Sequence, residues 1–467
     1  MIHHVRQSLR KSMAALAVAS VLLPASALAH TLEQAVAYTL DTHPEIRQAF
    51  NRFKGREEQV NQAFTGYLPT VDLTAGYGWE QTDSPSTRRQ AQTSDDDDKI
   101  DLDRRELGIS LKQILFDGFF TSSEVSRYSN EASSEQWTLF STAEDTALEV
   151  SKVYLNYMQA QEVVKLSEKN LVNHQEIYER IKEKTESGLG STADLSQIKG
   201  RLARAKSNLV AAKNNLFDTR SQYQKVVNRV PDDVILPVPD AEMIPASLDE
   251  ALKWAQEDHP TLKATNSDIQ AAKYERKSAK SNYYPQVSLE LSGNWDENVD
   301  GVDGSGITSD VGGESNELQA MVRLRYNLFS GGKDQARDRE ASYKQGEATE
   351  LRQRAYRDIV EGTTLAWNAR TFVNEQKLYL REHVVAAKET QQAYTQQFKI
   401  GQRTLLDLLD SENELFEARK DYLSAEFDEI TAQYRILNAT GQLLGALRIT
   451  TPDTWLGEDQ YEGGVRK

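Results

Sequence analysis

Asp407 and Asp410 lie three residues apart in the leucine-rich run GQRTLLDLLD at 401–410, and they are the first candidates for chemistry in this chain. Paired carboxylates often act as general acid and base in catalysis. The run itself holds no serine, cysteine or histidine, and no catalytic constellation stands out elsewhere in the sequence. We therefore predict that the chain is not an enzyme and that both carboxylates act through their charge.

Residues i and i+3 of a helix share one face, so the two carboxylates would lie side by side. In the ordinary interpretation they stand at a solvated helix start, where the helix dipole favours negative charge. In the alternative, several copies of the chain bring them together in a ring, which would raise some of their pKa values, attract cations and disfavour anions. The elements that position the run decide between the two.

No cofactor or metal motif accompanies the aspartates. The glycine-rich segment GLGSTA at 188–193 lacks a preceding strand, and no phosphate-binding loop of the GxxxxGK[ST] type is present. The seven histidines show no ligand spacing, while His43 and His259 each precede a proline and fit helix junctions. We expect neither a cofactor nor a bound metal.

The chain is an internal duplication. TLEQAVAYTLDTHPEIRQA at 31–49 aligns without gaps to SLDEALKWAQEDHPTLKAT at 247–265, an offset of 216. The offset later becomes 213, where GLGSTADL (188–195) meets GQRTLLDL (401–408). We predict one structural unit repeated. Its parts are a first repeat at 30–229, a linker at 230–246, a second repeat at 247–448, and a polar tail at 449–467 whose composition favours disorder.

Each unit contains two predicted strands. Apolar and polar residues alternate strictly in four segments, so each strand is apolar on one side only: 70–79, 106–112, 286–295 and 318–328. One interpretation is a small antiparallel sheet packed on helices. Strand length, hydrophilic links at 80–105 and 296–316, and aromatic residues near the strand ends favour a transmembrane barrel instead. The candidate girdle residues are Tyr77, Trp79, Trp295 and Tyr326.

Four strands cannot close such a barrel alone. Open sheet edges are not tolerated in lipid, and the smallest barrels have about eight strands. We therefore expect copies of the chain to pool their strands, eight from a dimer or twelve from a trimer.

A very long helix is predicted after each second strand. Residues 119–187 contain neither glycine nor proline, and 333–400 contain no proline. At 1.5 Å per residue each helix would be roughly 100 Å long and would need a coiled-coil partner. Turns at Gly188, Gly190 and Gly401 would begin the return helices, which places the two aspartates far from the strands.

The first 29 residues read as a secretory signal, with Arg6, Arg10 and Lys11 before an apolar run. Their removal changes the formal net charge from −16 to −19, which argues against nucleic acid as a partner. The sequence has no cysteine, so neither a disulfide nor a lipidated N-terminal cysteine is available. No 18-residue apolar run follows the signal, so we expect no transmembrane helix.

These segments, with YLPTV (67–71), YYPQV (283–287), LFDG (115–118) and LFSGG (328–332), resemble the TolC family of outer-membrane exit ducts over about 31–448. The resemblance implies a mainly α chain that forms a homotrimer. Its twelve-stranded outer-membrane β-barrel, surrounded by lipid, would continue as a long coiled-coil α-helical barrel in the periplasm of a Gram-negative bacterium.

The resemblance also implies a periplasmic gate. The ring of aspartates falls on Asp407 and Asp410, and the family closes it with links from a Tyr and an Arg to an Asp on the neighbouring coiled coil. The arginine falls on Arg403 and the acceptor on Asp194. Phe398 occupies the tyrosine position, and since a phenyl ring cannot donate a hydrogen bond, only the link between Arg403 and Asp194 is expected.

Two functions follow from the resemblance. The first is a passive exit duct for type I protein secretion, working with a periplasmic adaptor and an inner-membrane ABC transporter; LFDGF and YRILNATGQLL resemble the branch that serves large adhesins. The alternative is the outer-membrane factor of a multidrug or metal efflux pump with a proton-driven inner-membrane partner. A third possibility, a non-transporting coiled-coil adhesion or structural protein, is disfavoured by the four amphipathic strands.

Overall fold

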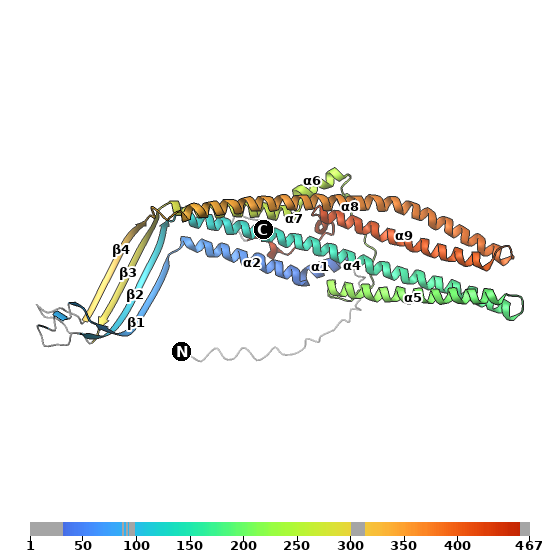
Figure 1. The fold of residues 1–467 in the computed structure, drawn as a ribbon, viewed down its shortest axis with the longest axis horizontal. Helices are drawn as coiled ribbons and strands as arrows, with labels where there is room; N and C mark the ends of the chain where they lie inside the picture. The colour runs from blue at the N-terminus through green and yellow to red at the C-terminus, as the bar shows by residue number, and fades with distance from the viewer. Residues whose placement is uncertain (1–30, 86–87, 90–91, 93–98, 300–312, 458–467) are drawn as a thin grey trace, which may run out of the picture.

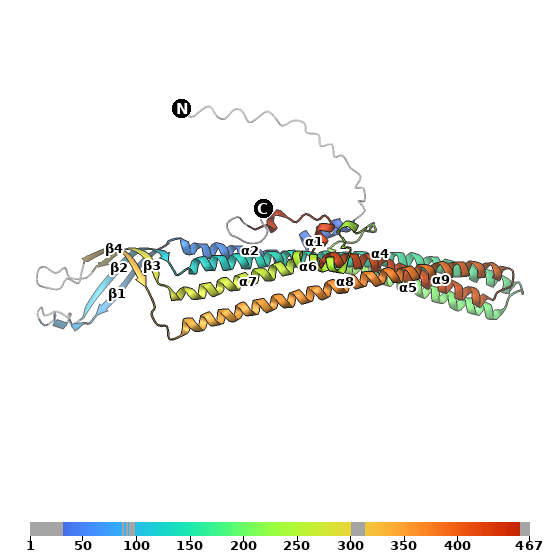
Figure 2. The ribbon, with the colours of Figure 1, turned by 90° about the horizontal axis from the view of Figure 1, so that it is seen from above.

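The chain folds into a long rod with a small sheet at one end and two tight helical turns at the other (Figures 1 and 2). This computed structural model describes residues 31–85, 88–89, 92, 99–299 and 313–457. The predicted signal at 1–29 lies outside the described residues, as do parts of both hydrophilic links and the end of the tail.

The order of elements is the same in both halves of the chain. The first half contains α1 (Leu32–Thr42), α2 (Pro44–Phe64), β1 (Thr70–Thr82), β2 (Ile100–Phe116), α4 (Phe120–Glu186) and α5 (Thr192–Val227). The second contains α6 (Leu248–Asp258), α7 (Pro260–Ala279), β3 (Gln286–Asn298), β4 (Gly313–Arg325), α8 (Lys333–Lys399) and α9 (Leu405–Ala439). A short helix, α10 (Leu443–Ala446), follows, and single 3-10 turns occur at Thr65–Tyr67, Ala241–Met243, Lys280–Tyr283 and Asp453–Trp455.

The two histidines before prolines cap helices, as predicted. His43 is the N-cap of α2 and His259 that of α7, each with proline at the first helical position, where a missing N–H costs nothing. The Nδ1 atom of His259 accepts a hydrogen bond from the backbone N–H of Thr261 at 3.2 Å. Burial lowers the pKa of His259 to about 4, so the ring is neutral and able to accept at neutral pH.

The predicted long helices are confirmed. α4 and α8 contain 67 residues each, about 100 Å of helix, and each packs against its return helix, α5 or α9. In the half of the rod nearer the sheet, α2 packs on α4, α4 on α7, and α7 on α8. No helix among the described residues combines the length and apolarity that crossing a membrane requires.

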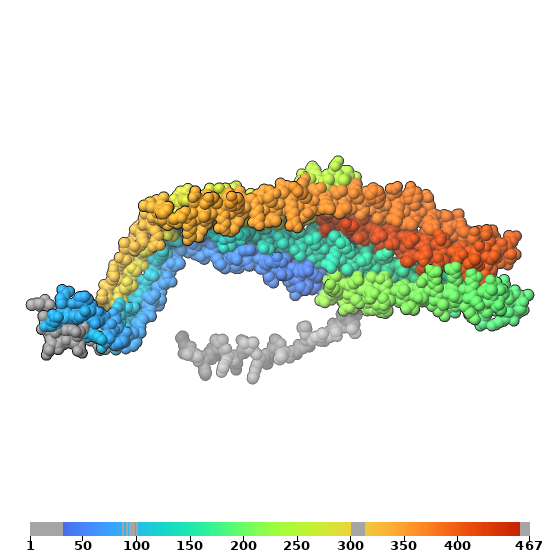
Figure 3. Space-filling model, viewed as in Figure 1, coloured from blue at the N-terminus to red at the C-terminus, as the bar shows by residue number. Residues whose placement is uncertain are grey.

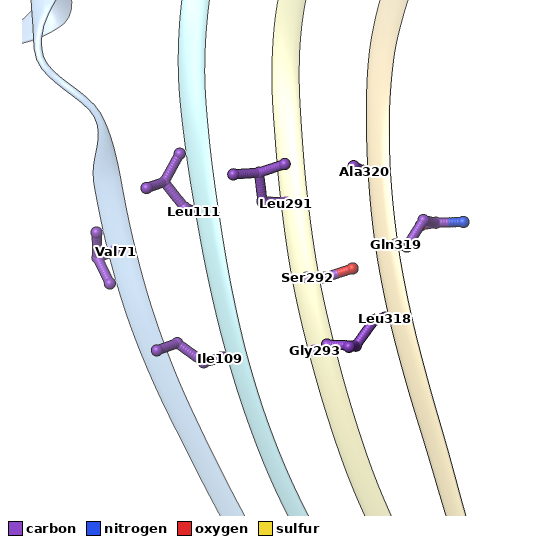
Figure 4. A pocket seen from close by; sticks show the side chains of 9 residues that line it. All are labelled: Val71, Ile109, Leu111, Leu291, Ser292, Gly293, Leu318, Gln319 and Ala320. Atoms are coloured by element: carbon purple, nitrogen blue, oxygen red, sulfur yellow. The ribbon is translucent and has the colours of Figure 1, made fainter.

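The four strands form one antiparallel sheet in the order β1-β2-β3-β4. Its register aligns apolar residues across all four strands, so that Val71, Leu111, Leu291 and Ala320 form one row of a bare hydrophobic face (Figure 4). That face is exposed, with Leu73 at 72% and Leu318 at 82%. The opposite face is polar and carries cross-strand ion pairs such as Arg323 Nε to Glu290 Oε2 at 2.8 Å.

One predicted strand boundary is wrong. The segment 318–328 was expected to be a strand throughout, but β4 runs from Gly313 to Arg325, so Tyr326 and Leu328 lie beyond its end. The side chain of Asn327 accepts a hydrogen bond from the backbone N–H of Phe329 at 3.2 Å. This local turn competes with strand pairing, a preference typical of asparagine.

The main hydrophobic core lies in the middle of the rod and joins α1, α2, α4, α5, α9 and α10. It also contains Trp455, which is only 4% exposed, and the expectation of a disordered tail is therefore wrong for residues 451–457. Gln136 of α4 donates to the backbone carbonyl of Trp455 at 2.8 Å, and the indole packs edge-on against Phe140. One buried aromatic residue orders a segment whose composition is otherwise polar.

Candidate gate at the distal turns

The turns between the long helices and the return helices lie at the end of the rod opposite the sheet (Figure 1). Gly188 and Gly401 have φ values of +75° and +78°, in the left-handed region that favours glycine. A Cβ atom on Gly190 would lie 2.8 Å from the backbone nitrogen of Thr185. Both turns therefore depend on glycine. Each turn leads into a return helix, and the two turns lie at the same end of the rod.

Asp407 is the third residue of α9 and forms a capping box with Thr404. Its carboxylate accepts hydrogen bonds from the hydroxyl of Thr404 at 2.9 Å and from the backbone N–H at 3.3 Å. These bonds, with a smaller contribution from the Arg403 guanidinium, hold the pKa of Asp407 below its usual range. Within one chain the carboxylate thus behaves as a helix cap, and its pKa is lowered rather than raised as expected of a crowded ring.

Asp410 is bound by a residue that sequence analysis missed. The guanidinium of Arg201, on α5, donates to the Asp410 carboxylate at 2.5 Å and so ties the first repeat to the second. The two residues are 209 positions apart, and no local pattern relates them. Only the packing of the two coiled coils brings them together.

The two aspartates do share one face of α9, as the i and i+3 spacing predicts. They line a shallow groove between α8 and α9 together with Glu414, His383 and Tyr394. His383 Nε2 lies 2.8 Å from Glu414 Oε1. Glu414 thus extends the acidic face by one further turn, a residue that the i+7 spacing from Asp407 could have identified.

Arg403 lies beside the acidic groove but does not contact Asp194 within the chain as described. Its Nε donates to Gln397 at 3.0 Å, and its guanidinium lies 4.3 Å from the ring centroid of Tyr394. Asp194 stands in the first turn of α5, next to the N-cap Ser191. The predicted link would therefore have to form between copies, and it stays a prediction.

Phe398 contributes apolar packing and not a hydrogen bond. It lies against an apolar cluster that joins the distal ends of α4, α5 and α9, and the Lys184 ammonium lies 5.5 Å from its ring centroid. The cluster consists of Ile177, Ile181, Ile198, Leu405, Leu408 and Leu409. The phenyl ring therefore helps to hold the two coiled coils together through burial of apolar surface.

The four aromatic girdle residues are exposed, three on the sheet and Tyr326 just beyond the end of β4. Tyr77, Trp79 and Trp295 stand toward the end of the sheet that carries the hydrophilic links, and Tyr326 stands at the end that leads into the helices. The Trp295 ring covers Gly293, where a Cβ atom would lie 2.9 Å from the indole. Aromatic side chains at both ends of an apolar face are typical of strands that span an outer membrane.

A sheet that is apolar on one face, joined to two coiled coils about 100 Å long, is the arrangement of an outer-membrane channel. The comparisons with known proteins place the chain more narrowly. The family model described as outer membrane efflux protein matches it twice, over residues 36–228 and 251–442. The chain belongs to this family, which also contains TolC; it is not an enzyme, and it resides in the outer membrane of a Gram-negative bacterium and extends into the periplasm.

Individual relatives match over nearly their whole length. Outer membrane efflux protein BepC of Brucella suis is 25% identical over 91% of this chain and 88% of its own, and outer membrane protein TolC of Vibrio cholerae is 25% identical over 90% and 93%. Alkaline protease secretion protein AprF of Pseudomonas aeruginosa is 21% identical over 91% and 87%. The crystal structure of CusC superposes with a TM-score of 0.74 at 14% identity, covering 88% of this chain and 91% of that one.

Proposed function

We propose that three copies of this chain form the exit duct of a type I secretion system, through which a protein substrate leaves the cell. The observation that supports this most is the sheet, apolar on one face and polar on the other, at one end of helices about 100 Å long. Three such sheets supply twelve strands for a barrel with a polar lumen in outer-membrane lipid, and the helices extend that lumen into the periplasm.

The distal acidic face is the proposed gate. Threefold symmetry would repeat Asp407 and Asp410 to give six carboxylates around one opening, a potential that attracts cations. Arg403 of one copy would reach Asp194 of the neighbouring copy, while Arg201 holds Asp410 within its own chain. Phe398 contributes apolar packing where the family has a hydrogen-bonding tyrosine.

Secretion is favoured over efflux by the likeness of LFDGF and YRILNATGQLL to ducts that serve large adhesins, and by the similarity to the secretion protein AprF. In this role the chain would receive its substrate from a periplasmic adaptor and an inner-membrane ABC transporter. The second candidate is the outer-membrane factor of a multidrug or metal efflux pump, which the similarity to BepC supports.

The deciding experiment is crosslinking in living cells from positions in the distal turns, 188–191 and 401–403, followed by mass spectrometry of the attached proteins. An adaptor that co-purifies with an ABC ATPase would support secretion. An adaptor that co-purifies with a proton-driven pump would overturn it in favour of efflux. Substitutions at Gly188 and Gly401 should be avoided, because their positive φ values make any side chain costly.

A further inference from the structure

The chain has two long free edges. α8 runs along one side of the rod, and α2 and α5 run along the opposite side (Figure 3). α7 packs between two long helices, α4 and α8. Its counterpart α2 packs on only one long helix among those described, α4. One face of α2 is therefore uncovered where the equivalent face of α7 is covered.

Because the chain is duplicated, each residue of the first repeat has a counterpart in the second repeat at a fixed sequence offset. α4 and α8 begin 213 residues apart, at Phe120 and Lys333, and α2 and α7 begin 216 apart, at Pro44 and Pro260. The strands obey the same offsets.

Val71 pairs with Leu111 across β1 and β2, and adding 216 and 213 gives the pair of Val287 with Leu324 that β3 and β4 form. The offsets thus predict strand register within the chain without error at this position.

The helices obey the offsets as well. Val60 of α2 and Val125 of α4 belong to one apolar cluster, and their counterparts Arg276 of α7 and Asp338 of α8 form an ion pair at 3.0 Å. Gly66 lies against Thr121, and their counterparts Asn282 and Asp334 form a hydrogen bond at 2.8 Å. A contact in one repeat therefore locates a contact in the other, even where the residue types differ.

The contact between α4 and α7, internal to the chain, pairs polar or charged side chains with uncharged partners. The hydroxyls of Ser141 and Thr261 lie 2.9 Å apart, and the Lys263 ammonium lies 4.9 Å from the ring centroid of Trp137. Ser134 forms a side-chain hydrogen bond with Asp268. Adding 213 to a residue of α4 gives its counterpart on α8, and subtracting 216 from a residue of α7 gives its counterpart on α2. These two counterpart helices form the two free edges.

A fourth internal contact, between the hydroxyls of Ser133 and Ser267 at 3.1 Å, becomes Gly346 with Asn51, but the other three become pairs of opposite charges. The resulting pairs are Arg354 with Glu45, Glu350 with Arg47, and Glu347 with Arg52. All six residues are exposed in the single chain. We propose that these three ion pairs join α8 of one copy to α2 of the next, an inference that rests on the proposed assembly of several copies.

The shape of α2 supports this partner. A shallow groove on its free face is lined by Arg47, Arg52 and four neighbours, Thr42, Pro44, Gln48 and Asn51. The counterparts of Pro44 and Gln48 on α7, Pro260 and Ala264, are buried, and Pro260 lies against Gly441 in the turn after α9. The groove therefore leaves open on α2 a position that is covered on α7 in the other repeat.

The charges also select how copies meet. In a membrane all copies point the same way. Two α8 edges facing each other would therefore place Glu347 and Glu350 beside the same carboxylates of the other copy, and these like charges would repel. Two α2 edges would oppose Arg47 and Arg52. Only the unlike edges attract, which specifies a head-to-tail ring rather than a two-fold dimer.

The test is a charge exchange at one pair. Arg52 and Glu347 form no ion pair or hydrogen bond with other described residues, so Arg52→Glu and Glu347→Arg break no such bond within the described chain. Each single variant should dissociate several-fold faster than the wild type when the purified assembly is heated in mild detergent at low salt. The double variant should return to the wild-type rate. Combining Arg52→Glu with Glu361→Arg, four turns further along α8, is the matched control and should give no rescue.

A second measurement tests the same offsets in the sheet. Ile109 pairs with Gly293 inside the chain, so Val322 of one copy should face Tyr77 of the next. Because the sequence has no cysteine, Val322→Cys with Tyr77→Cys should crosslink between copies, whereas Val322→Cys with Gly76→Cys should not, since Gly76 points to the other face.

The outcomes separate the two proposals. If the wild type has the mass of a monomer in mild detergent, the proposed duct fails. If it is a trimer but the charge exchange does not rescue and the Gly76 crosslink forms in place of the Tyr77 crosslink, the duct stands and this interface is wrong.

Discussion

Two arginines approach the paired aspartates from different elements, and we expect them to have different roles. Arg201 holds Asp410 within the chain, whereas Arg403 does not contact Asp194 there and instead contacts Gln397 and Tyr394, with its guanidinium 3.9 Å from the Asp407 carboxylate. The first contact ties the two coiled coils of one copy. The second residue remains available for a link between copies.

Arg403→Ser should raise the single-channel conductance of the purified channel in lipid, because a closing link between copies would be lost. Arg201→Ser is the matched comparison, since it removes a partly exposed ion pair worth about 0.2–1 kcal/mol inside one copy. We expect Arg201→Ser to destabilise the chain slightly and to change conductance less. Unchanged conductance in Arg403→Ser would contradict the proposed gate.

Glu144 is a buried carboxylate whose ionisation opposes folding. It accepts hydrogen bonds from the backbone N–H groups of Leu443 at 3.0 Å and Leu444 at 3.2 Å, but burial outweighs them and raises its pKa to about 8. The folded chain therefore binds more protons at this site than the unfolded chain between about pH 4.5 and pH 8. Its contribution to stability is present below that range and is lost as the pH rises through it.

Glu144→Gln should remove this pH dependence, because the amide carries no titratable charge, although its single oxygen can replace only one of the two carboxylate oxygens that accept from Leu443 and Leu444. The site contributes at most about 1.4 kcal/mol per pH unit to the free energy of unfolding. Melting temperatures of the wild type and the variant, measured from pH 5 to pH 8, should change relative to each other, because the wild type loses stability as the pH rises and the variant does not lose it at this site. Parallel curves would show that Glu144 does not titrate as described.

Sequence patterns locate residues at this scale only where the partner is close in the chain. The face shared by Asp407 and Asp410 follows from their spacing, and the capping of Asp407 by Thr404 follows from the helix start. The bond from Arg201 does not, because it depends on the packing of helices from different repeats. The burial of Glu144 has the same origin.

At the scale of elements, the joint between the sheet and the long helices depends on Gly118. Its φ of +69° lies in the left-handed region, and a Cβ atom would lie 2.5 Å from the carbonyl oxygen of Ser281. Its counterpart Gly331 has a φ of +67° with open space around it. The two glycines share a backbone conformation and differ in their surroundings.

Gly118→Ala should therefore cost more stability than Gly331→Ala. Strain alone costs roughly 1–2 kcal/mol in either variant, and the clash with Ser281 adds to it only at position 118. The melting temperatures of the two variants, compared with the wild type, measure the difference. Equal losses would mean that the backbone around Ser281 moves aside without cost.

The C-terminal segment is an element that one residue orders. Trp455→Ala should release residues 451–457 from α4, because it removes the edge-on contact with Phe140 and the apolar burial. Faster amide exchange confined to this segment is the expected signal. Asp453→Ala, at an exposed position two residues away, should leave exchange unchanged.

Elements were predicted best where the physical signal is long. The absence of proline and nearly all glycine over 67 residues left no alternative to a single helix for α4 and α8. Strand ends were predicted less well, since β2 extends to Ile100 and Phe116, beyond the alternating segment at 106–112. There the pairing with β1 and β3 sets the boundaries, and alternation in one strand cannot show it.

At the scale of the whole molecule, β1 and β4 are each paired on one side only among the described strands. Joining a second copy covers two edges and brings two new ones, so an open assembly of any size retains the same two unpaired edges. Only the closing copy removes both, and unpaired backbone groups in lipid cost several kcal/mol each.

Assembly of this chain should accordingly be all-or-none. Subunits mixed at rising concentration, and trapped by crosslinking at Val322→Cys with Tyr77→Cys, should pass from monomers to closed rings with very little dimer. An abundant dimer would mean that the edges are protected in some other way. Every assembly short of the closed ring therefore offers the same two edges for aggregation, so the time that subunits spend before closure, rather than the strength of any one contact, sets the yield of finished channels.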